Sequence, residues 1–134
     1  MWKSSLSLQC DVSLTGNALG RAGEDVVVHH YERRGYQLIE RNWRSGAMGE
    51  LDLIFERGSG ADREIVFCEV KTRVARTHEL GLAAVSPTKI RRMRALIGVW
   101  LEEHPQRGVS IRGDVASVLW RDDVGQVEVI EGAF

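Results

Sequence analysis

Charged side chains interrupt two segments that otherwise have the composition of buried strands. Asp52 lies in the first segment, residues 49–54, and Glu69 and Lys71 end the second, residues 66–71. Side chains alternate between the faces of a strand, so Glu69 and Lys71 share one face about 7 Å apart. Burying a charge is costly unless the ion is paired or bound to metal, so two acids and a lysine here indicate a site. We expect a metal-dependent nuclease.

Phosphodiester cleavage needs an activated water and neutralisation of developing negative charge, and a divalent ion supplies most of this. Mg²⁺, or Mn²⁺ in its place, prefers oxygen ligands such as the carboxylates of Asp52 and Glu69. Glu24 is a candidate third donor, directly or through water. Lys71 is expected to orient the attacking water and stabilise transition-state charge. The predicted catalytic residues are therefore Glu24, Asp52, Glu69 and Lys71, whereas the proximity of Glu50 to the metal is left open.

Basic residues are concentrated after the second charged segment. Residues 71–94 contain seven Lys or Arg and one acid, although the formal net charge of the chain is −1. Such a local excess favours contacts with phosphates. With DNA as the expected partner, the predicted nucleic-acid contacts are Arg73, Arg76, Lys89, Arg91 and Arg92. The alternative for the helical positions is the solvated face of an amphipathic helix.

Hydrophobic periodicity and turn residues predict an α/β fold in which a mixed sheet is flanked by helices, in the order αβββαββ. Residues 15–35 contain the first helix, and Ser86-Pro87 supply the cap and first position of a second helix that ends near His104. The strands are expected at 36–44, 49–56, 64–71, 110–120 and 126–130. Residues 1–14 are predicted to be a flexible tail, 15–134 a single domain, and 72–85 a long basic connection.

The composition is that of a globular protein: 134 residues, 43% hydrophobic and 28% charged. Two cysteines favour a reducing compartment, and we expect a cytoplasmic protein that does not enter a membrane, because no run approaches the roughly 18 apolar residues of a spanning helix. Cys68 and three of the four tryptophans, Trp43, Trp100 and Trp120, are expected in the core. The pair His29-His30 has no metal-spaced partner and is expected at the surface.

Asp52 followed by Glu69-Val70-Lys71 resembles the PD-(D/E)XK, or restriction-endonuclease-like, superfamily. More specifically, the chain resembles the bacterial YraN-type family of small proteins with an expected endonuclease activity. Six motifs in the same order carry this resemblance, at residues 20–25, 35–36, 41–44, 49–54, 67–73 and 84–89. The chain departs from the family pattern at Cys68, where valine or isoleucine is commoner, and at Arg112-Gly113-Asp114, where an aromatic residue is usual.

The resemblance spans about residues 15–120 and implies a core of one helix, three strands, a helix and another strand. It also implies Mg²⁺-dependent cleavage of DNA, with Asp52 and Glu69 as metal ligands, Lys71 as the catalytic lysine and Glu24 as an auxiliary acid. Archaeal Holliday-junction resolvases are among the implied relatives, which adds branched or junction DNA to the candidate substrates.

Two other functions remain open. One is a non-catalytic nucleic-acid-binding module on the same fold, and the other is an interaction protein whose charged strands form structural ion pairs. A nuclease that cuts both strands needs two sites, which favours a homodimer, although no segment of the sequence marks an interface.

Overall fold

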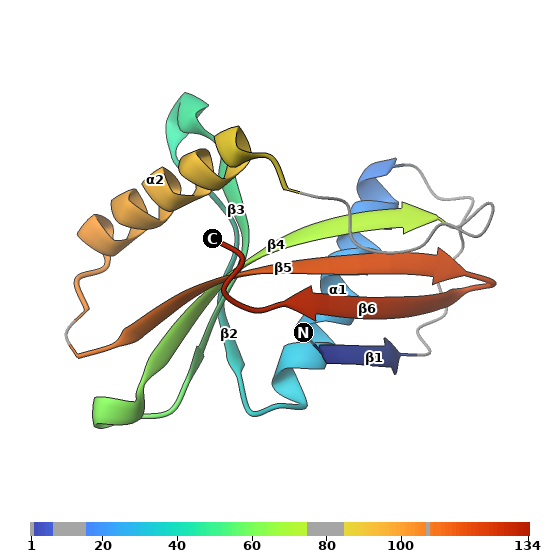
Figure 1. Cartoon of the computed structure of the whole chain (residues 1–134), viewed down its shortest axis with the longest axis horizontal. Coiled ribbons are helices and arrows are strands. Elements are labelled where there is room, and N and C mark those ends of the chain that lie inside the picture. The colour runs from blue at the N-terminus through green and yellow to red at the C-terminus, as the bar shows by residue number, and fades with distance from the viewer. Residues whose placement is uncertain (1, 7–15, 75–84, 107) are drawn as a thin grey trace.

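A computed structural model describes residues 2–6, 16–74, 85–106 and 108–134 (Figure 1). The predicted order αβββαββ is confirmed, with one further strand at the N-terminus. In chain order the elements are β1 (Trp2–Leu6), α1 (Gly16–Glu32), β2 (Gln37–Arg44), η1 (Gly46–Met48), β3 (Glu50–Arg57), η2 (Gly60–Asp62), β4 (Glu64–Val74), α2 (Pro87–Glu103), β5 (Ser110–Arg121) and β6 (Val124–Ile130). None of the helices described is long and apolar enough to cross a bilayer.

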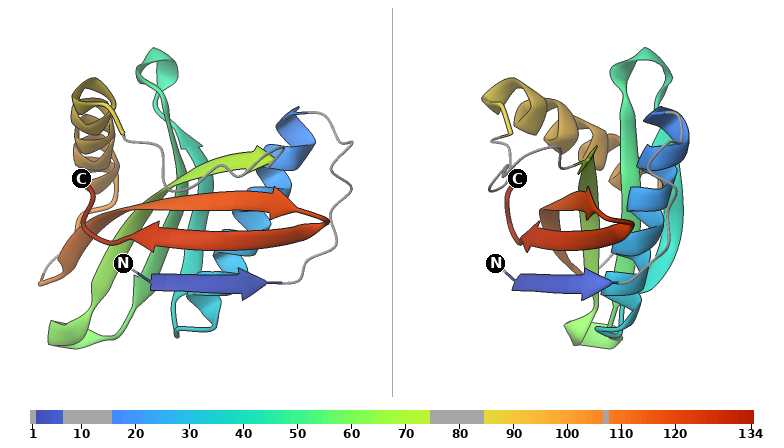
Figure 2. Two further views of the ribbon diagram at one scale, coloured as in Figure 1. Left: turned by 45° about the vertical axis from the view of Figure 1, so that its right-hand side comes forward. Right: turned by 90° about the vertical axis from the view of Figure 1, so that its right-hand side faces the viewer.

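The strands described form one mixed sheet in the order β1-β6-β5-β4-β3-β2. β4 and β5 run parallel, and the neighbouring pairs β3–β4 and β5–β6 are antiparallel. A parallel pair needs a crossover connection, and α2 lies in the connection between β4 and β5. α1 and α2 lie on opposite faces of the sheet (Figure 2). This is the predicted α/β class, consistent with a restriction-endonuclease-like core.

Alternation along β4 divides its side chains between two cores. Val66 and Cys68 belong to the core under α1, whereas Ile65 and Phe67 belong to the core under α2. The same alternation carries Glu69, two residues after Phe67, to the face that α2 covers. The expected core positions are confirmed: Cys68 is 2% exposed, and the tryptophans Trp43, Trp100 and Trp120 are all buried.

The first turn of α2 is fixed as its sequence predicts. Oγ of Ser86 accepts a hydrogen bond of 3.2 Å from the backbone N–H of Lys89, and Pro87 occupies the first turn. Serine is preferred at the cap because its hydroxyl oxygen accepts a hydrogen bond from a free N–H of the first turn. Proline is preferred at the first position because the N–H that it lacks would have no helical acceptor there. The start of α2 therefore determines where Lys89 and Arg92 lie.

Two segments differ from the expected organisation. Residues Trp2–Leu6 of the expected tail pair with β6 as an edge strand, while residues 7–14 lie outside the described residues. An edge strand is held by main-chain hydrogen bonds, so its side chains need not show a regular hydrophobic period. The expected connection 72–85 also begins later, because β4 continues to Val74 in register with β5. Arg73 therefore lies on a strand, and Arg76 falls outside the described residues.

His30 is not a surface residue as expected. Its side chain is fully buried, whereas the neighbouring His29 is exposed. Burial first, and then the charges of Arg34 and Arg33, lower the pKa of His30 from 6.5 to about 3. The imidazole is therefore uncharged near neutral pH and lies on the buried side of α1.

A buried ion pair lies in β5, in the segment where the sequence departs from the family pattern. Asp114 is completely buried, and Oδ1 and Oδ2 accept hydrogen bonds of 2.8 and 2.9 Å from the guanidinium of Arg112. The hydroxyl of Tyr31 on α1 donates a third, of 2.6 Å. This network links α1 to the sheet and compensates the buried charge.

Candidate functional site

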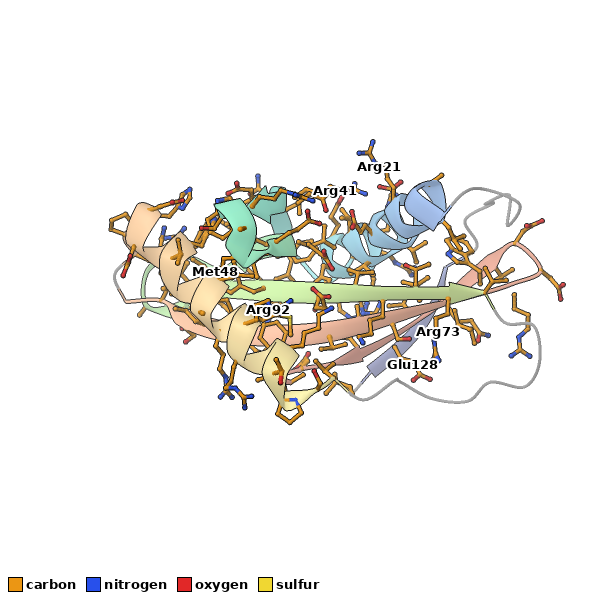
Figure 3. All side chains as sticks on the ribbon, turned by 90° about the horizontal axis from the view of Figure 1, so that it is seen from above. Arg21, Arg41, Met48, Arg73, Arg92 and Glu128 are labelled. Atoms are coloured by element: carbon orange, nitrogen blue, oxygen red, sulfur yellow. The ribbon has the colours of Figure 1, made fainter. Side chains whose placement is uncertain are left out.

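The two predicted acidic ligands lie in one pocket between the sheet and α2. The pocket has a volume of about 200 Å³ and is lined by Gly49, Glu50, Asp52, Glu69, Lys89, Arg92, Met93 and Leu96. Figure 3 shows α2, on which Arg92 is labelled, crossing β4. The pocket therefore combines carboxylates from β3 and β4 with cationic side chains from α2.

The register of β3 and β4 brings Asp52 and Glu69 together. Leu53 and Cys68 are opposite each other in the antiparallel pair, and each acid is the next residue beyond this pair. Opposite residues in an antiparallel pair project from the same face. The backbone N–H of Val70 also donates a hydrogen bond of 2.8 Å to Oδ2 of Asp52, which holds that carboxyl against β4.

The environment of Asp52 disfavours its ionised form. Burial, followed by the nearby charge of Glu69, raises the pKa of Asp52 from 3.8 to about 8. The N–H of Val70 opposes this shift, while the charge of Glu24 adds to it. Two carboxylates that repel each other in a partly dry pocket are a donor set that fits a hard divalent cation, because such an ion would stabilise both negative charges.

Glu69 is paired with a lysine of α2. Oε1 of Glu69 lies 2.5 Å from Nζ of Lys89. The sequence predicts Lys89 as a nucleic-acid contact, so its contact with a metal-ligand candidate is a feature that sequence reasoning missed. The available signal was the Ser86-Pro87 helix start, which places Lys89 in the first turn of the helix that follows β4.

Glu24 does not line the pocket and is held in place by β2. Its Oε1 accepts hydrogen bonds from Nε of Arg41 at 3.2 Å and Nδ2 of Asn42 at 3.4 Å. α1 comes close to β4 because residue 23 is glycine, and a Cβ there would collide with the side chain of Thr72. In the described parts of the chain, no three His, Cys, Asp or Glu side chains are grouped to hold a metal ion. Glu24 as a third ligand therefore remains a prediction.

Lys71 lies two residues after Glu69 on β4 and is half-buried. Alternation places it on the face of Glu69, but it does not line the pocket of about 200 Å³. Glu50 does line the pocket, and its Oε2 lies 3.0 Å from Nε of Arg44. The catalytic role of Lys71 remains a prediction.

The predicted nucleic-acid contacts are distributed over two elements. Lys89, Arg91 and Arg92 lie in the N-terminal half of α2, where Arg91 and Arg92 are exposed. Arg73 lies near the end of β4. Lys89 and Arg92 are the two that also line the acidic pocket, so the cationic side of α2 faces the carboxylates at this point.

Comparison with known proteins places the chain in a family. Residues 23–118 match the model described as "Uncharacterised protein family UPF0102". The chain belongs to the UPF0102 family. This is the YraN-type family that the six motifs resemble, so that prediction is confirmed.

Several UPF0102 proteins align over most of their length. One from Clavibacter michiganensis subsp. michiganensis is 41% identical over 116 residues, covering 86% of this chain and 94% of the relative. One from Mycobacterium sp. (strain KMS) is 43% identical over 119 residues, covering 88% of this chain and 84% of the relative. One from Frankia casuarinae is 42% identical over 120 residues, covering 88% and 97%.

Among solved structures, the UPF0102 chain has a distant likeness to one described as the structure of Pyrococcus furiosus SfsA in complex with Ca²⁺. The TM-score is 0.35 at 21% sequence identity, and the alignment covers 89% of this chain and 62% of that chain. The chain thus spans less than two thirds of that protein's length.

Proposed function

We propose that this chain is a metal-dependent endonuclease that hydrolyses phosphodiester bonds in DNA, with branched or junction DNA among its candidate substrates. The observation that carries the proposal is the pairing of Asp52 and Glu69 in one pocket beneath the cationic side of α2. Carboxylates that hold a divalent ion beside side chains that neutralise phosphates are the parts that phosphodiester hydrolysis requires.

Each residue has a distinct role in this proposal. A bound Mg²⁺ or Mn²⁺ ion would supply Lewis-acid activation of the phosphate and of the attacking water. Asp52 and Glu69 would hold the ion through carboxylate oxygens, and Asp52 would give up its proton on doing so. Glu24 orients a water at the edge of the site. Nζ of Lys71 donates a hydrogen bond to the reacting water or phosphate and stabilises the developing charge.

A cleavage assay tests the proposal. Purified protein is incubated with linear duplex, single-stranded, flapped and four-way DNA in Mg²⁺ or Mn²⁺. We expect strand cleavage that EDTA abolishes and that Asp52→Asn or Lys71→Ala lowers by at least about 100-fold. Asp62→Asn is the matched control, because Asp62 is an exposed carboxylate of η2 outside the pocket, and it should cleave normally. If every DNA stays intact with both ions, the proposal fails.

The position of Lys71 favours a second candidate, a nucleic-acid-binding module without catalysis, because this lysine does not line the acidic pocket. Such a module would bind DNA in EDTA with an affinity that falls steeply as salt rises. Arg92→Ala would weaken that binding, whereas Asp52→Asn would not. Salt-sensitive binding without cleavage would favour this candidate over the nuclease.

A further inference from the structure

Glu69 already has a cationic partner inside the pocket. Nζ of Lys89 lies 2.5 Å from Oε1 of Glu69. Only 8% of Glu69 is exposed, so the amine neutralises a carboxylate that has little access to water. A divalent ion would need a carboxylate oxygen at about 2.0–2.1 Å. The ammonium and the ion therefore compete for the same carboxylate.

Lys89 is anchored by its backbone and movable at its amine. The backbone N–H is held by the hydroxyl of Ser86 at 3.2 Å, which fixes the first turn of α2. The side chain is 42% exposed and has a flexible four-carbon stem. The amine can therefore leave Glu69 for water without moving the helix or opening the core.

We propose that Lys89 is an internal counterion of Glu69, which a divalent ion must displace in order to bind Asp52 and Glu69. The proposal rests on the proposed function, since it concerns the same metal ion. Before the ion binds, the lysine stabilises the acidic pocket. When the ion binds, the lysine leaves and loses its ion pair, so Lys89 weakens metal binding while it stabilises the metal-free protein.

Mn²⁺ titration of the full-length protein by calorimetry tests this inference without any measurement of activity. In Lys89→Met the aliphatic stem is kept and the competing charge is removed. We expect Mn²⁺ to bind at least about five-fold more tightly to this variant than to the wild type. Arg92→Met is the matched control, because it removes one positive charge from the lining of the same pocket without removing the partner of Glu69. Its affinity should change by less than about two-fold.

A second variant keeps the test decisive if Lys89→Met does not fold. Lys89→Arg retains the charge, and its planar guanidinium can hold a carboxylate with two N–H groups, so Mn²⁺ should bind no more tightly than to the wild type. Circular dichroism checks that each variant is folded before titration.

The outcomes separate the two proposals. If Mn²⁺ binding is abolished by Asp52→Asn but Lys89→Met does not bind more tightly, the counterion role is wrong and the metal site stands. An equal gain for Arg92→Met also overturns the counterion role, because it would show a general effect of charge. If no Mn²⁺ binding depends on Asp52 in any variant, the metal site itself fails, and the proposed nuclease with it.

Discussion

Oδ2 of Asp52 accepts a hydrogen bond of 2.8 Å from the backbone N–H of Val70. This contact joins β3 to β4 just beyond Leu53 and Cys68, the last residues that pair in the ladder between the two strands. A main-chain donor cannot rotate away, so the carboxyl of Asp52 is held in one orientation beside Glu69. The ligand geometry is therefore set by the sheet rather than by flexible side chains.

Asp52→Asn should make the metal-free protein increasingly more stable than the wild type as pH rises from about 4 to about 8. The pKa of Asp52 is raised from 3.8 to about 8 in the folded protein, so folded Asp52 keeps a proton that the unfolded chain has lost. The stability that protonated Asp52 contributes to the wild type is complete below pH 3.8 and is lost as pH rises toward about 8. Asparagine has no such dependence, and its oxygen can still accept from Val70.

The advantage of Asp52→Asn should grow by up to about 1.4 kcal/mol per pH unit in that window. Urea denaturation in EDTA at several pH values measures it. A difference between the two proteins that stays constant with pH would contradict the shifted pKa.

Arg41→Ala should destabilise the protein by about 1–2 kcal/mol, because Arg41 is partly buried and pairs with Glu24 at 3.2 Å and Asp25 at 2.7 Å. Arg44→Ala is the control, since Arg44 pairs with Glu50 at 3.0 Å but its side chain is 76% exposed. An exposed pair of this kind should contribute less than about 0.5 kcal/mol. Equal losses for the two variants in urea denaturation would show that Arg41 does not secure α1 against β2.

Gly113→Ala should destabilise the protein by about 1–3 kcal/mol, since a Cβ at this position would collide with the ring and carbonyl of Phe134. The carbonyl of Gly113 also accepts hydrogen bonds from the backbone N–H groups of Ala133 and Phe134, so the C-terminal residues pack directly on β5. Thermal unfolding measures the effect.

Gly98→Ala provides the opposite expectation for the same chemical change. Gly98 lies on the exposed side of α2, and nothing lies within 4 Å of an added Cβ. Alanine should therefore stabilise the helix by about 0.5–1 kcal/mol.

If Gly113→Ala were as stable as the wild type, the packing of Phe134 on β5 would not be required for the fold.

The elements that local rules govern could be predicted from the sequence. Alternation with a period of two put Glu69 on a defined face of β4, and the Ser86-Pro87 pair set the start of α2 within one residue. Asp52 and Glu69 were predicted as partners because two neighbouring strands joined by a turn must pair antiparallel. Their sharing of one pocket follows from that register.

The partners supplied by the helices could not be predicted in the same way. Lys89 meets Glu69, and Arg41 meets Glu24, only after α1 and α2 have packed on opposite faces of the sheet. No local periodicity encodes how far a helix is shifted along a strand. The burial of His30 was missed for a similar reason, because it depends on which side of α1 the sheet covers.

The absence of a side chain at Gly23 lets the backbone of α1 lie directly against Thr72 of β4. Any larger residue at position 23 would lever the helix outward and withdraw the following residue, Glu24, from Asp52. The distance from Glu24 to Asp52 thus depends on the contact between Gly23 and Thr72, which lies on the opposite face of β4 from Glu69. A substitution at position 23 would therefore change the position of Glu24 by moving the whole of α1 away from the sheet, and not by changing the rotamer of Glu24.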